Sequence, residues 1–144
     1  MLRVIIAAIA VFVLWEATDI LVHGYFLAGE YAKIPEVVLP KEEMRVPLLL
    51  LVVLAHAVIF TKIYSWLVSP TSVLAGIIFG LLWGVAHGVG MGYGMYATMR
   101  VPLIIASTWF SLTVVQGVLA GAIVGAIVRK RDEPAPGVPV GRGA

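Results

Sequence analysis

The stretch VLAGIIFGLLWGVAHGVGMG, residues 73–92, contains no Asp, Glu, Lys or Arg and has a glycine at every fourth position from Gly76 to Gly92. A helix needs roughly 20 apolar residues to cross the hydrocarbon core of a bilayer. Small residues four apart let a neighbouring helix backbone approach closely, and this close approach drives helix association in lipid. The stretch therefore predicts a transmembrane helix that packs tightly against another helix.

Three further stretches have the length and hydropathy of a spanning helix, and none alternates polar and apolar residues as a barrel strand does. The predicted spans are residues 4–28, 46–68, 72–98 and 101–128. The last span repeats the glycine spacing of the third, so the two are expected to pair. The glycines predicted to pack them together are Gly76, Gly80, Gly84, Gly88, Gly92, Gly117, Gly121 and Gly125.

The composition is that of a chain that lies mostly in lipid. Of its 144 residues, 61% are hydrophobic and only 12% are charged, and the mean hydropathy is +1.03. Soluble domains keep about 25% of their residues charged. The net charge of +2 is too small and too scattered to indicate nucleic-acid binding. We predict an all-α, multi-pass membrane domain over residues 1–128, with the lipid bilayer as a partner and without nucleic acid.

The distribution of Lys and Arg predicts the orientation, because these residues favour the cytoplasmic side of span ends. The densest positive run is Arg-Lys-Arg at 129–131, and a Pro/Gly-rich segment follows it. We predict an antiparallel four-helix bundle with both termini in the cytoplasm and a disordered cytoplasmic tail over 129–144. Six aromatic residues near span ends are expected at the lipid–water interface: Tyr25, Tyr31, Tyr64, Trp66, Tyr93 and Tyr96.

Several ionisable residues fall inside the predicted spans, where each is costly unless it is paired. In the first span three of them are spaced at i, i+3 and i+7, which places them on one face of a helix. Counted along each helix, the histidines of three spans fall in the central to outer part of the bilayer. We predict a buried polar cluster or ligand-binding site made of Glu16, Asp19, His23, His56 and His87.

Three main interpretations of this cluster stay open, beside a quinone or other lipid-like ligand and an interface in which these groups pair with another subunit. The simplest is a satisfied polar core in which Asp19 or Glu16 bonds a histidine of another helix. The second is a haem b or copper centre, because haem b needs two histidines on facing helices and copper accepts imidazole and thioether ligands. The third is a proton or ion path through Glu16, Asp19 and Gln116. The candidate metal ligands are His23, His56, His87, Met91 and Met95.

Enzyme chemistry has little support in the sequence. There is no Ser-His-Asp constellation, phosphate-binding glycine loop or His-Glu-x-x-His motif. Cysteine is absent, which excludes a thiolate nucleophile and a Cys-based metal site. No catalytic residue is predicted.

Two segments and the glycine-rich third span together resemble a group of short, uncharacterised bacterial four-span inner-membrane proteins. The segments are Asp19-x-x-x-His23-Gly24-x-x-Leu27-x-x-x-Tyr31 and Phe60-Thr61-x-Ile63-Tyr64. The likeness covers roughly residues 5–130. It implies a location in the bacterial inner membrane and four spans, and it implies that Asp19, His23 and Tyr31 belong to a shared pattern. It implies no particular activity.

The sequence thus favours a small inner-membrane protein that acts as a structural or accessory subunit, or as a small binding module. Its glycine-lined faces also allow a homo-oligomer or a place in a larger membrane complex, because four helices are not expected to cover every small-residue face internally. The alternatives are a haem b- or copper-binding electron-transfer or transport protein and a small transporter or proton path.

Overall fold

The computed structural model describes residues 1–128, which form helices and turns without a strand. Four helical segments are long and apolar enough to cross a membrane: Leu2–Phe26, Val46–Leu67, Val73–Thr98 and Leu103–Ile127. The prediction of four apolar helices is confirmed, and the predicted span ends differ from these bounds by no more than two residues. The predicted tail, 129–144, lies outside the described residues.

A π-helical turn interrupts both the first and the third span. In chain order the elements are α1 (Leu2–Leu21), η1 (Val22–Phe26), α2 (Ala28–Tyr31), η2 (Lys41–Glu43), α3 (Val46–Leu67), α4 (Val73–Gly88), η3 (Val89–Gly94), α5 (Met95–Thr98) and α6 (Leu103–Ile127). The π turn η1 contains His23-Gly24, and η3 begins directly after His87-Gly88. Such turns insert a residue into a helix and are frequent at functional sites.

The turn between α3 and α4 is fixed by Tyr64 and Ser72. The Ser72 hydroxyl accepts a hydrogen bond from the Ala75 backbone N–H at 3.0 Å and caps α4. The Tyr64 hydroxyl donates to the Ser72 carbonyl at 2.8 Å and accepts from the Ser72 N–H at 3.1 Å. Tyr64 is fully buried, so its side chain packs inside the bundle near the end of α3 and does not face the surrounding lipid.

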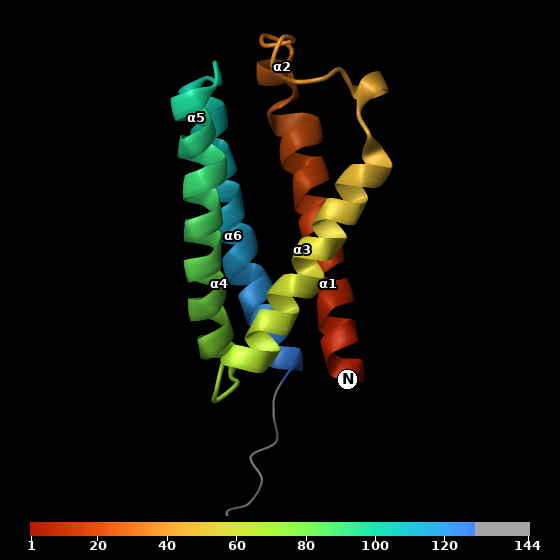
Figure 1. Cartoon of the computed structure of the whole chain (residues 1–144), viewed down its shortest axis with the longest axis vertical. Coiled ribbons are helices and arrows are strands. Elements are labelled where there is room, and N and C mark those ends of the chain that lie inside the picture. Colours follow the sequence, from red (N-terminus) through yellow and green to blue (C-terminus); the bar gives the residue numbers. More distant parts are fainter. Residues whose placement is uncertain (129–144) are drawn as a thin grey trace, which may run out of the picture.

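Helices α4 and α6 lie side by side along most of their length (Figure 1) and make the most extensive contact between two helices. Their glycines line this contact. A Cβ atom at Gly80 would overlap the carbonyl oxygen of Gly117, and one at Gly76 would overlap that of Gly121. Gly84, Gly92 and Gly125 likewise meet backbone carbonyl oxygens of the facing segment, whereas Gly88 meets the side chains of Thr113 and Phe110. Except at Gly88, the two backbones therefore touch at these glycines with no side chain between them.

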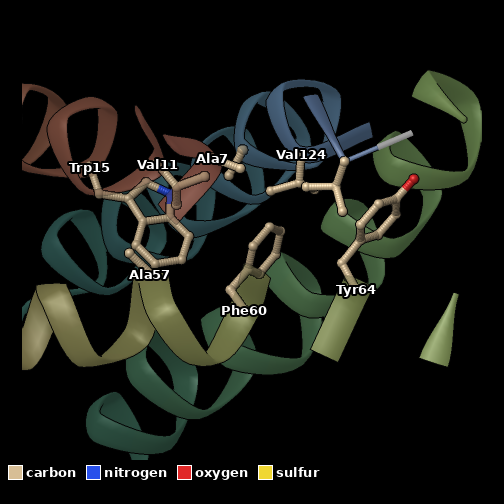
Figure 2. Packing of buried hydrophobic residues seen from close by; sticks show 9 residues of the cluster. Ala7, Val11, Trp15, Ala57, Phe60, Tyr64 and Val124 are labelled. Carbon is tan, nitrogen blue, oxygen red and sulfur yellow. The ribbon is translucent and has the colours of Figure 1, made fainter. Parts of the chain in front are cut away.

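The hydrophobic core fills the space between α1, α3 and α6 and extends toward α4. Figure 2 shows Phe60 and Tyr64 of α3 beside Trp15 and Val11 of α1 and Val124 of α6. The Phe60 ring packs edge-to-face on Trp15, with centroids 5.5 Å apart. On the α4 side Phe60 contacts Phe79 and Trp83, so large aromatic side chains separate α3 from α4.

The beginning of α3 lacks such packing. All residues of 46–52 are exposed, and this stretch covers every face of the helix over about two turns. We call residues 46–52 the exposed α3 segment. Figure 1 shows α3 tilting away from the α4–α6 pair toward its Val46 end. Among residues 1–128, the rest of the chain does not cover this segment.

Candidate functional site

A network of hydrogen bonds links α1 to α6 around Gln116. The Gln116 side-chain amide donates to Asp19 Oδ1 at 2.8 Å and to the Thr18 hydroxyl at 2.6 Å, and it approaches the Trp15 carbonyl at 3.4 Å. The Trp15 indole N–H donates to the backbone carbonyl of Gln116 at 3.3 Å. Gln116 itself is buried. Asp19 is therefore hydrogen-bonded to Gln116 of α6, whereas the sequence analysis suggested a histidine as its partner.

His23 and Tyr31 extend this polar region toward the end of the first span. The Tyr31 hydroxyl is hydrogen-bonded to His23 Nδ1, and the two rings are nearly parallel. The Trp109 indole N–H donates to the same hydroxyl at 2.7 Å. An indole N–H only donates, so the Tyr31 oxygen accepts from Trp109 and its O–H is available to His23 Nδ1. Donation from Tyr31 corresponds to the His23 tautomer that carries its proton on Nε2.

Tyr31 lies outside the spanning segments but is largely shielded from water. Burial raises the pKa of its hydroxyl above the ordinary value of 10.0, and the negative charge of Asp19 adds to the rise. The hydrogen bond from Trp109 acts in the opposite direction but is the weaker influence on the pKa. Tyr31 therefore keeps its proton at physiological pH, and its hydroxyl is hydrogen-bonded to side chains of the first span and α6.

Glu16 is placed differently from the other predicted site residues. It precedes Asp19 by three residues on α1, and its Oε1 atom is buried without a hydrogen-bond partner among residues 1–128. No hydrogen bond in the described part of the chain joins Glu16 to a histidine. The structure therefore places Glu16 beside Asp19 and outside the hydrogen-bonded network.

The other two histidines form a separate pair. His56 of α3 and His87 of α4 pack edge-to-face with ring centroids 5.4 Å apart and an interplanar angle of 71°. His56 Nδ1 donates to the Val52 carbonyl, one turn earlier on α3, at 2.9 Å. Both side chains are partly exposed. The predicted five-residue cluster is thus divided into Asp19 with His23, the pair His56 and His87, and Glu16.

Neither of these groups has the geometry of a haem centre or of a metal centre with three or more His, Asp or Glu ligands. No three His, Asp or Glu side chains within residues 1–128 could share one metal ion. The axial histidines of a haem b lie on opposite faces of the macrocycle. His56 and His87 touch each other, and Phe60 and Trp83 pack together one turn away with centroids 5.6 Å apart. Two rings in direct contact do not have the arrangement of axial haem ligands.

The remaining candidate ligands follow His87 on the third span. Met91 lies in the π turn η3 and is 44% exposed, whereas Met95 begins α5 and is partly buried. Sequence reasoning missed Thr18, Tyr31 and Trp109 as members of the polar network. A usable signal for Tyr31 was its place in the Asp-His-Gly-Tyr run, but Thr18 and Trp109 carried none.

No protein-family model, curated protein or solved structure matches the chain. Function is therefore inferred from the residues and their contacts alone.

Proposed function

We propose that the chain is a non-enzymatic accessory subunit of the bacterial inner membrane whose exposed α3 segment packs against a larger membrane protein. The observation that carries this proposal is the exposure of residues 46–52 on every face of the helix. Leu49 is 52% exposed and Leu51 is 60% exposed. A helix surface of Leu and Val presents large side chains that fill a groove between the helices of a partner.

The glycine faces favour a partner that is a different protein over a second copy of this chain. Small-residue stripes are the usual surfaces of membrane helix association. Here the stripes of α4 and α6 are occupied by each other, as Gly80 on Gly117 and Gly76 on Gly121 show. The glycine surface that would pair two copies is therefore used inside one chain, whereas the exposed α3 segment is left uncovered on every face.

The polar network suits a supporting role. Gln116, Asp19 and Thr18 bond α1 to α6, and Trp109 bonds the end of the first span to the same helix. Hydrogen bonds between helices in a membrane fix their rotation and register. In the proposed arrangement this antiparallel bundle, with both termini in the cytoplasm, is a rigid frame that holds α3 in position for its partner.

Photo-crosslinking in living cells tests this function. Benzoylphenylalanine would replace Leu49 or Leu51 in the exposed α3 segment. Matched control positions are Leu82 on α4 and Ile9 on α1, which are 65% and 54% exposed. We expect a discrete, heavier protein adduct from the α3 positions and no such adduct from the controls. An adduct of twice the chain's mass, or none at any α3 position, would contradict the proposal.

A second candidate function is a proton path, favoured by the line of titratable groups on the first span. Glu16, Asp19 and His23 follow one another along the helix, and the hydrogen bond between His23 and Tyr31 continues the line outside the span. The unpartnered Glu16 oxygen lies beside this line. In liposomes that contain a pH-sensitive dye, such a path predicts proton flux that Asp19→Asn abolishes in a folded protein. Equal flux with and without the substitution would exclude it.

A further inference from the structure

The histidine pair between α3 and α4 is not used by the proposed accessory role. His56 and His87 come from different helices and meet with ring centroids 5.4 Å apart. Two imidazoles that bind one ion through nitrogen have centroids roughly 6 Å apart, given a metal–nitrogen distance of about 2 Å. The centroid distance of this pair is therefore close to that of two rings that share an ion. Because the rings meet edge-to-face, one ring must also rotate to direct a nitrogen of each ring toward the ion.

The hydrogen bond of His56 prepares the ring for a ligand. A carbonyl oxygen only accepts, so His56 Nδ1 carries the proton in its bond to the Val52 carbonyl. The lone pair of the neutral ring is then on Nε2. Metal-binding histidines commonly donate their other ring N–H to a backbone carbonyl in this way, which fixes the tautomer and the ring orientation.

The ring of His87 lacks a hydrogen-bond partner within residues 1–128. The ring that it contacts is that of His56. A polar nitrogen in the hydrocarbon region is costly without a partner. Gly90, one turn after His87, has no atom within 4 Å of the position of a Cβ, so the approach on that side is open.

The donor set decides which ion fits. The described residues bring no third His, Asp or Glu to the pair, and the chain has no cysteine. The energy needed to move an ion into a low-dielectric medium rises steeply with its charge, so two neutral imidazoles favour a monovalent ion over Zn²⁺. Cu(I) is stable with two ligands, and imidazole suits copper.

We propose that His56 and His87 bind one Cu(I) ion between His56 Nε2 and a ring nitrogen of His87. The site is distinct from the Asp19–Gln116 network and does not depend on the accessory role. It places a copper ion inside the membrane portion of the chain, between two helices that otherwise meet through aromatic side chains.

The test is an anaerobic titration of the purified full chain in lipid nanodiscs, without a histidine tag, against a chromophoric Cu(I) chelator. We expect one Cu(I) per chain. His56→Gln and His87→Gln should each weaken affinity by more than about 100-fold, because even loss of an outer hydrogen bond can weaken metal binding 10- to 100-fold. His23→Gln is the matched control and should bind as tightly as the wild type, since His23 is engaged by Tyr31.

X-ray absorption of the copper-loaded wild-type protein gives a readout that needs no variant. We expect two nitrogen neighbours with the outer-shell scattering of imidazole. The proposal is overturned if the wild type binds no more Cu(I) than the His56→Gln/His87→Gln double variant, or if His23→Gln lowers the affinity as much as the other two substitutions. A spectrum dominated by sulfur, or tighter binding of Zn²⁺ than of Cu(I), would also overturn it.

Discussion

Tyr31 is the residue through which the first span is bonded to α6 at the α2 end of the bundle. It accepts from the Trp109 indole and is hydrogen-bonded to His23 Nδ1, so one hydroxyl satisfies two side chains. If Phe replaced it, the indole N–H and the imidazole nitrogen would both lose their partner. A partner removed from a buried polar group leaves the desolvation of that group uncompensated.

We therefore predict that Tyr31→Phe lowers the free energy of unfolding by about 1–2 kcal/mol at neutral pH. The difference should shrink as the pH rises above 10.0. The raised pKa keeps the hydroxyl protonated in the folded state while the unfolded chain releases its proton, so the wild type loses stability there and the variant does not. Denaturant unfolding in detergent between pH 8 and pH 11, followed by circular dichroism, measures both effects. A difference that does not change with pH would contradict the raised pKa.

Gln116 is the second residue on which the network depends. It is buried and donates to the Asp19 carboxylate, so Gln116→Leu would leave that carboxylate without its hydrogen bond from α6. We predict a loss of about 1–3 kcal/mol in unfolding free energy. Asp19→Asn in the same background should recover part of it, with a coupling energy of about 1 kcal/mol. Strictly additive losses in this double-mutant cycle would show that the two residues do not interact.

At the scale of the element, the third span offers a matched pair of glycines. A Cβ at Gly80 would overlap the Gly117 carbonyl oxygen of α6, whereas a Cβ at Gly90 would meet nothing within 4 Å. We predict that Gly80→Ala lowers the unfolding free energy by about 3 kcal/mol, because α4 and α6 must separate. Gly90→Ala should leave it unchanged or raise it by up to about 1 kcal/mol, because alanine favours helix. Similar losses in both variants would mean that glycine flexibility, and not the close helix contact, determines stability.

The π turns show where pattern reasoning about an element reaches its limit. Hydropathy predicts the spans 4–28 and 72–98 as continuous helices, because an inserted residue changes neither length nor composition detectably. In the structure η1 and η3 shift the faces of the residues that follow. Spacings counted across them, such as His23 to Tyr31 or His87 to Met95, therefore do not give the side of the helix on which a side chain lies.

At the scale of the whole molecule, the four spans were predictable because length and hydropathy alone decide them. Which of the polar residues come together in the structure was not predictable. Three histidines and Asp19 fall at similar depth, but depth does not say how each helix is rotated about its axis. That rotation pairs His56 with His87 and sets Asp19 against Gln116. It depends on how α1 and α3 pack around Phe60 and on the α4–α6 contact, which one sequence does not specify.

The whole-molecule arrangement also makes the orientation testable. The loop between the first two spans and the turn between α3 and α4 lie at opposite ends of the bundle (Figure 1), and Glu36 and Ser69 are exposed there. The chain has no cysteine, so Glu36→Cys and Ser69→Cys each introduce a single thiol. If the positive run at 129–131 holds the C-terminal end of α6 in the cytoplasm, a membrane-impermeant maleimide should label Glu36→Cys in intact spheroplasts. Ser69→Cys should be labelled only after lysis, and the reverse pattern would place both termini outside the cytoplasm.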